Sequence, residues 1–179
     1  MAEAAENYIS QRVAPIFRRQ ALFVWAAAVA VAALWLSAIV GAPILAAGGH
    51  SGLAGAIYHF FGFACHQIGE RSFHLAGHQF AVCSRCFGVY FGLLAGIAAY
   101  PVWRSIDEVE SLPRIWLLLS LVPIGIDWSL GVFGIWENTH LSRFVTGMLL
   151  GAACGTFIMP ALVEIVRNRT SHRILRAAG

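Results

Sequence analysis

The sequence predicts an all-α integral membrane protein with four transmembrane helices and one additional short helix. Of its 179 residues, 59% are hydrophobic and only 12% are charged, about half the charged share of an ordinary soluble domain. So few charges cannot cover a water-exposed surface, and the chain has four apolar runs near the length of about 20 residues that a bilayer requires. The net charge of +3 is small and dispersed, which argues against a nucleic-acid partner. The expected partner is the lipid bilayer.

The chain is expected to form a single membrane domain. We expect the transmembrane spans at residues 21–47, 85–103, 115–136 and 144–165. The first apolar run is longer than the core of a secretory signal, so we interpret it as a retained anchor. Residues 52–64 are apolar but too few to cross the bilayer alone, which predicts a re-entrant or interfacial half-helix. Residues 65–84 then form an outer loop.

Arginines set the expected orientation. The chain has twelve arginines and no lysine, and seven of the arginines lie in the two tails. Positive charge accumulates on the cytoplasmic side of membrane proteins, so both termini are expected in the cytoplasm. An even number of spans satisfies this condition. The loop at 65–84 and the polar turn at 137–143 then share the extracytoplasmic face.

Glycines recur every four residues in two of the expected spans. They are Gly88, Gly92 and Gly96 in the second span and Gly147, Gly151 and Gly155 in the fourth. Such stripes let helix backbones approach closely. We expect these spans to pack against each other, against a second copy of the chain, or against a partner in a membrane complex. The plainer alternative is that glycine is simply frequent in membrane helices.

The outer loop concentrates residues that bind metals. Cys65-His66 is followed by a Cys-x-x-Cys pair, Cys83 and Cys86. Paired thiols at this spacing chelate one ion from a single turn, and zinc sites commonly add one or two further Cys or His ligands. We therefore predict a site for zinc, or another transition metal, made by Cys65, His66, Cys83 and Cys86.

The fourth ligand is open to alternatives. Adjacent Cys65 and His66 can hardly both bind one ion without strain. Other candidate ligands are His74, His78, His140 and Asp127. An ion that keeps one position open would make its bound water nucleophilic near neutral pH.

The same thiols admit two other interpretations. Thiols outside the cytoplasm tend to oxidise, and Cys-x-x-Cys is the usual spacing of an exchangeable pair, so a thiol redox protein coupled to a quinone is one alternative. Against it, the motif has no thioredoxin-like βαβ context, and the third thiol would need a partner. Inert buried thiols are the other alternative.

Asp127, His140 and Arg143 are the candidate catalytic residues. A carboxylate inside a membrane span is costly and generally marks a pathway, a ligand or an ion pair. Its expected partner is Arg143 or Arg85. With a metal, Asp127 and His140 would act as acid and base while Arg143 holds an anion. The alternative for Asp127 is a structural ion pair that locks two helices together.

A longer pattern contains these motifs. The run CHQIGERSF…CSRCFGVYFG resembles the CHQxxxRSF…CxRCxGxYxG signature of a family of small prokaryotic multi-pass membrane proteins of unknown function. The likeness covers about residues 60–155, and two residues depart from it: Phe87, where we expect a small polar residue, and His140, where we expect asparagine. The resemblance implies a protein of the prokaryotic cytoplasmic membrane with a cysteine-rich outer loop, and it implies no reaction.

Three functions follow from these observations. The first is a structural scaffold or partner subunit whose extracytoplasmic metal ion pins the outer loop. The second is a metal-dependent enzyme acting on a lipid or isoprenoid head group. The third is the thiol redox protein coupled to a quinone.

Overall fold

The computed structural model describes residues 2–178, with side chains described for residues 14–170. Five α-helices are described: α1 (Ala2–Ala47), α2 (Ser51–Gly62), α3 (Ser84–Trp103), α4 (Ile115–Val132) and α5 (His140–Ala178). Between α2 and α3 lie a 3-10 turn, η1 (Gly69–Arg71), and an antiparallel ribbon of β1 (His74–Leu75) and β2 (His78–Gln79). Four helices, α1, α3, α4 and α5, are long and apolar enough to cross a membrane. The predicted all-α class, with four spans and one short helix, is confirmed.

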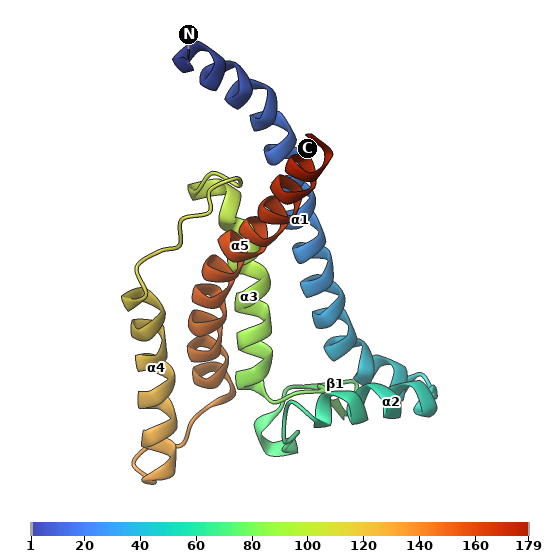
Figure 1. Ribbon diagram of the computed structural model, residues 1–179. Coiled ribbons are helices and arrows are strands. Elements are labelled where there is room, and N and C mark those ends of the chain that lie inside the picture. The colour runs from blue at the N-terminus through green and yellow to red at the C-terminus, as the bar shows by residue number, and fades with distance from the viewer. Residues whose placement is uncertain (1, 179) are drawn as a thin grey trace.

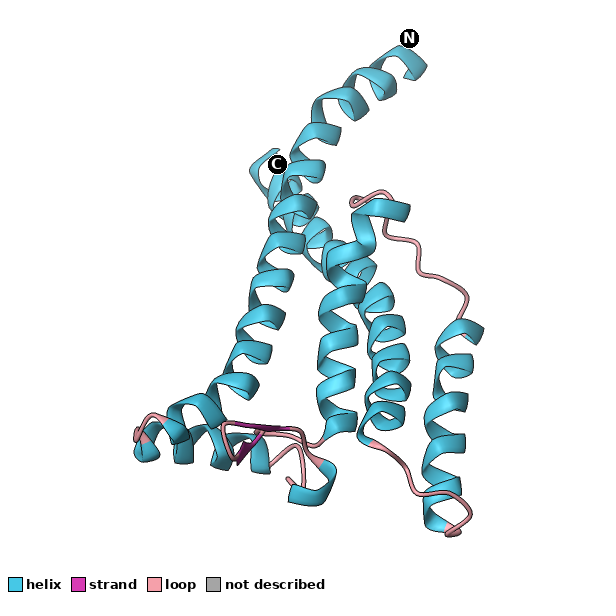
Figure 2. Ribbon diagram, turned by 180° about the vertical axis from the view of Figure 1, so that it is seen from behind, coloured by secondary structure: helices cyan, strands magenta, loops and turns pink. Residues whose placement is uncertain are grey.

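The four long helices run between two ends of the molecule (Figure 1). α3 and α5 lie side by side in the middle, with α1 on one side and α4 on the other. Both termini and the loop 104–114 lie at one end, while α2, the ribbon and the α4–α5 turn lie at the other (Figure 2). We call the latter the loop end. α2 lies crosswise to α1 there, as a half-helix at the bilayer surface would. Arg12, Arg173 and Arg176, which contribute to the charge of the tails, lie outside the residues whose side chains are described.

The outward surfaces of the long helices are apolar. α4 has no buried residue, and its Leu118, Ile126 and Trp128 side chains are all more than half exposed. In water such a surface would drive aggregation. In a bilayer it is the expected exterior, because lipid is as apolar as these side chains.

Glycine brings the backbones of α3 and α5 into contact. A Cβ atom added at Gly92 would collide with the carbonyl oxygen of Met148, and one at Gly151 would collide with that of Val89. The other glycines that meet the opposite backbone in the same way are Gly88, Gly96, Gly147 and Gly155. Both stripes therefore lie within the interface between these two helices of a single chain.

Proline creates the contact that attaches the outer loop to α1. Pro43 lies inside α1 and has no N–H, so the carbonyl of Ile39, four residues earlier, lacks its helical partner. The backbone N–H of Ala81 donates to this carbonyl, with an N–O distance of 3.3 Å. The surrounding core cluster consists of Leu36, Ile39, Ala42, Phe61, Cys65, Ala81 and Val82. This cluster holds the cysteine-rich loop against α1 and α2.

A second proline also leaves a helix carbonyl free to accept a hydrogen bond from another segment. Pro101 in α3 leaves the carbonyl of Ile97 without its helical donor. The indole N–H of Trp25 on α1 donates to that oxygen, at 2.9 Å. A second core cluster surrounds this bond and comprises Ala21, Ile97, Tyr100, Ile106, Met159 and Val163.

Helix boundaries differ from the expected spans mainly around the α4–α5 turn. α4 ends at Val132 rather than at 136, because the chain reverses at Gly134, which has a φ of +66°. α5 begins at His140 rather than at 144. Its first turn is capped by the Thr139 hydroxyl, which accepts the backbone N–H of Ser142 at 3.0 Å, a favourable arrangement at a helix N-terminus. At the chain ends, α1 and α5 continue through the segments that we expected to be tails.

Candidate metal centre

The first turn of α3 carries two of the predicted ligands. Cys83 is the N-cap residue, with φ −66° and ψ 161°, and Cys86 follows three positions later. Residues three apart on a helix lie on the same side, so both thiols are presented from one edge of the turn. The N-terminus of a helix carries a partial positive charge, which favours the thiolate form of a cysteine placed there.

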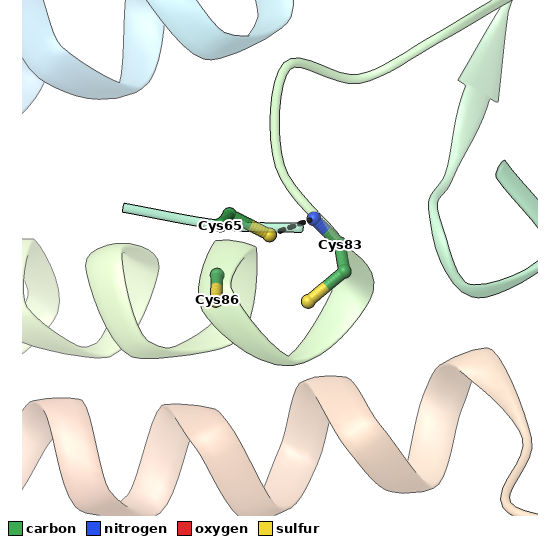
Figure 3. A group of neighbouring side chains, drawn as sticks. All are labelled: Cys65, Cys83 and Cys86. Carbon is green, nitrogen blue, oxygen red and sulfur yellow. Dashed lines mark hydrogen bonds between the residues drawn. The ribbon is translucent and has the colours of Figure 1, made fainter. Parts of the chain in front are cut away.

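Cys65 reaches the same point from the segment that follows α2. Its Sγ accepts the backbone N–H of Cys83 at 3.2 Å, and the Sγ atoms of Cys65, Cys83 and Cys86 all lie within 4.8 Å of one another. Figure 3 shows the three side chains together, with Cys65 beside the first turn of α3. Cys65 is buried, with 7% of its surface exposed. The prediction that the three cysteines meet is confirmed, and we call them the thiol cluster.

Within the thiol cluster, the surroundings of Cys65 favour the thiolate form. Hydrogen bonds from the thiols of Cys83 and Cys86 hold the pKa of the Cys65 thiol well below its usual range. The backbone N–H groups of Cys83 and Gln67 act in the same direction, against the opposing effect of burial. Because the thiolate is the form that binds metal, Cys65 is prepared for coordination.

Gln67 organises the loop around the thiol cluster. Its side-chain amide donates to the carbonyl of Tyr58 at 2.7 Å and to that of Ala81 at 2.8 Å. Its own carbonyl accepts from the side chain of Gln79 at 3.2 Å, and the Tyr58 hydroxyl donates to the Gln79 carbonyl at 2.5 Å. Gln67 thereby joins α2, β2 and the segment before α3. No role was predicted for Gln67 from the sequence, where its only signal is its place after Cys65-His66 in the CHQxxxRSF signature.

Ser84 and His140 form a second connection near the cluster. The Ser84 side chain is fully buried, and its hydroxyl donates to the carbonyl of Arg71 at 2.9 Å. With that proton committed, the hydroxyl accepts from Nδ1–H of His140, also at 2.9 Å. The His140 ring packs against Phe73, with centroids 5.6 Å apart. His140 therefore links α5 to α3 and the loop, and it is not among the residues grouped with the three thiols.

Asp127 is engaged in a network of its own. Its carboxylate pairs with the guanidinium of Arg85 and accepts from the side-chain amide of Asn138 at 2.9 Å. Only 10% of the Asp127 side chain is exposed. Of the two partners that we considered, the structure selects Arg85 rather than Arg143. Asp127 and His140 therefore have different partners.

A groove of about 810 Å³ opens beside the thiol cluster. It runs between the outer loop, the start of α3 and the α4–α5 turn, and its charged or ligating side chains belong to Cys65, His66, Glu70, Arg71, Cys83, Arg85, Cys86, Glu137 and Arg143. His66 is exposed and lines this groove. Among the residues with described side chains, no histidine or carboxylate joins the three thiols to make a four-membered cluster.

Comparison with known proteins places this site within a family. Residues 65–157 match the family described as predicted membrane protein (DUF2085). The chain belongs to the DUF2085 family. The matched region begins at Cys65 and contains the whole thiol cluster, so the family resemblance expected from the sequence is confirmed at this level.

Two archaeal relatives support the assignment. An uncharacterized protein of Methanocaldococcus jannaschii is 34% identical over 113 residues, which are 63% of this chain and 72% of the relative. An uncharacterized protein of Methanothermobacter thermautotrophicus is 34% identical over 114 residues, 63% of this chain and 95% of the relative. No solved structure matches the chain significantly.

Proposed function

We propose that this DUF2085 protein is a membrane scaffold whose outer loop is fastened by one zinc ion, bound by the thiolates of Cys65, Cys83 and Cys86. The observation that carries the proposal is the convergence of the three Sγ atoms within 4.8 Å. Zinc–sulfur bonds of about 2.3 Å in a tetrahedral site place the sulfur atoms about 3.8 Å apart. Small side-chain rotations therefore suffice to bring the thiol cluster around one ion.

His66 is the proposed fourth ligand. It is the only histidine lining the groove within the described part of the chain, and an exposed side chain can turn toward the cluster. A Cys₃His set is one of the usual structural zinc sites. If strain between Cys65 and His66 keeps the imidazole ring of His66 away, water in the groove would take the fourth coordination position of the zinc ion.

The ion would act as a cross-link between two segments. Cys65 follows α2, whereas Cys83 and Cys86 belong to the start of α3. Besides the core cluster that includes Ala81 and Val82, the intervening loop is held by single hydrogen bonds such as those of Gln67 and Ser84. A metal that joins its two ends would contribute stability directly, because the unfolded chain has no preformed site.

The scaffold would lie in a prokaryotic cytoplasmic membrane, with both termini in the cytoplasm and the metal at the extracytoplasmic face. Support comes from the arginine-rich tails and from the position of the termini at the end opposite the thiol cluster (Figure 1). Both glycine stripes are engaged within the chain, so an oligomer or partner complex would need another surface.

The geometry favours the scaffold over the enzyme and the redox protein. Asp127 is held by Arg85 and Asn138, and His140 by Ser84, so neither faces the thiol cluster as an acid or base. A two-electron thiol pair would leave one of the three cysteines without a partner.

Metal analysis of the purified protein tests the proposal. We expect one zinc ion per chain, its loss in Cys86→Ser, and its retention in the control Cys154→Ser, since Cys154 lies within α5 outside the cluster. After chelation, all four thiols should become alkylatable. A disulfide between Cys83 and Cys86 in protein that contains no metal would contradict the proposal and favour the redox function.

A further inference from the structure

We propose that the groove beside the thiol cluster is a binding site for a phosphate group, held by Arg71 and Arg143. This goes beyond the metal site, because the binding groups are arginines that belong to no part of the thiol cluster. The inference rests on the charges of the groove, on the lack of partners for two of them, and on the position of the groove at the loop end.

Three arginines from different segments line the groove. Arg71 comes from η1, Arg85 from the first turn of α3 and Arg143 from the first turn of α5. The charges of Arg71 and Arg85 act unfavourably on the charge of Arg143, and Asp127 and Cys83 act in the opposite direction less strongly. Gathering like charges at a half-buried position costs free energy, and an anion placed between them would relieve that cost.

Only one of the three arginines has an ion-pair partner among the described side chains. Arg85 pairs with Asp127, and the one other ion pair among the described side chains, Arg104 with Glu108, lies outside the groove. Neither Arg71 nor Arg143 has an ion-pair partner within the described residues. These two cations are therefore available to a ligand.

Two acidic residues also line the groove, and they do not cancel this charge. Glu70 and Glu137 are exposed, so water and salt screen them. Neither lies within ion-pair distance of an arginine in the described structure. Arg143 is half-buried, where screening is weaker and the attraction for an anion is stronger.

Arginine binds carboxylate and phosphate groups alike, and the tryptophans of the groove favour a phosphate. The planar guanidinium donates two parallel hydrogen bonds to phosphate oxygens, and Arg71 and Arg143 come from two different segments that line the same groove. Trp128 and Trp136 also line the groove and are exposed. Tryptophan is typical of the depth at which lipid head groups lie, so the phosphate group of a lipid is the natural source, with free phosphate as the other source of the same chemistry.

Calorimetric titration of the purified full-length protein in neutral detergent tests this proposal. The probes are dioctanoyl phosphatidic acid, dioctanoylglycerol, which lacks the phosphate, and inorganic phosphate. We expect saturable binding of the phosphatidic acid and none of the dioctanoylglycerol. Arg71→Gln should weaken binding about tenfold, because a hydrogen bond to a charged group is lost, and the double variant Arg71→Gln, Arg143→Gln should abolish it.

Control variants distinguish binding at this site from nonspecific electrostatic attraction of the anionic probes. Arg114→Gln removes one arginine from the opposite end of the molecule and should leave binding unchanged. Arg143→Lys keeps the positive charge but removes the planar guanidinium with its two parallel donors, and should weaken binding. If Arg143→Gln fails to fold, Arg71→Gln decides, because Arg71 is exposed and its side chain makes no ion pair within the described part of the chain.

The outcomes distinguish this inference from the metal proposal. Binding that persists after chelation supports the arginine site whether or not zinc is present, whereas binding that disappears with the metal overturns it. Equal binding of dioctanoylglycerol, or unchanged binding in Arg71→Gln, also overturns it. Inorganic phosphate that binds as tightly as the phosphatidic acid supports the site and assigns free phosphate as the ligand.

Discussion

Single residues at the loop end show why the cysteines meet. Gln67 adopts a φ of +50°, a conformation that few side chains other than Asn and Asp tolerate, and it uses its amide to satisfy two carbonyls from separate segments. The strained backbone is retained because it aims the amide at these carbonyls. Gln67 is therefore a positioning residue for Cys65, two positions earlier.

Replacing Gln67 by alanine should loosen the loop in the metal-free protein. Loss of two hydrogen bonds to part-buried carbonyls should cost about 2 kcal/mol, so local opening should make alkylation of Cys65 about 30-fold faster. Timed alkylation followed by mass spectrometry measures this rate. The control Asn168→Ala, an exposed residue of α5, should leave the rate unchanged, and an unchanged rate in Gln67→Ala would disprove the positioning role.

Elements are held together in two different ways. α3 and α5 meet through backbone contact along glycine, whereas α4 has no buried residue and is joined to its neighbours through the polar network of Arg85, Asp127 and Asn138. The first interface depends on shape and the second on charge. Substitutions in the two interfaces should therefore destabilise the protein for different reasons: an added side chain disrupts the first, and an unpaired charge disrupts the second.

Gly92→Ala tests the shape-dependent interface. The added methyl group would collide with the Met148 carbonyl, and overpacking of this kind costs about 2 kcal/mol. We expect Tm in detergent to fall by about 4–8 °C. Gly125→Ala in α4, where an added Cβ meets nothing within 4 Å, is the matched control and should keep or raise Tm. Equal behaviour of the two variants would refute backbone contact as the basis of the interface.

Asp127→Asn tests the charge-dependent interface. The substitution leaves Arg85, whose side chain is only 22% exposed, without its counter-charge, which should cost about 3 kcal/mol. The double variant Arg85→Gln, Asp127→Asn removes both charges and should recover part of that loss. Thermal unfolding of the two variants measures the coupling. A double variant less stable than Asp127→Asn would show that the unpaired charge of Arg85 does not explain the loss of stability in Asp127→Asn.

At the scale of the whole molecule, composition and spacing predict a good part of the architecture. Apolar runs of sufficient length predict four spans, and the segment around 52–64 predicts a short helix, because both follow from the thickness of the bilayer. The Cys-x-x-Cys pair with a preceding cysteine predicts the thiol cluster. These features depend on local chemistry that is written directly in the sequence.

Features that depend on distant partners could not be predicted in the same way. The donation from Ala81 to the carbonyl freed by Pro43, and the choice of Arg85 as the partner of Asp127, need the relative placement of helices. His140 shows most clearly which contacts the sequence does not predict. Its proximity to the cysteine loop was expected, but its bond to Ser84 was not. Contacts across helices depend on rotation about their axes, which periodicity alone does not determine.

Orientation in the membrane yields a prediction for the entire chain. A green fluorescent protein fused after Gly179 should fluoresce in a bacterial host, because the arginine-rich C-terminus remains in the cytoplasm. Alkaline phosphatase fused after residue 110, in the loop between α3 and α4, should be inactive for the same reason. Active phosphatase at that position would invert the proposed topology and move the thiol cluster to the cytoplasmic side.

X-ray absorption at the metal edge of the purified protein tests the central claim most directly. We predict one zinc ion whose first shell contains three sulfur atoms at about 2.3 Å and one lighter ligand at about 2.0–2.1 Å, and no zinc in Cys65→Ser, as in Cys86→Ser. A first shell made only of nitrogen and oxygen would contradict the account.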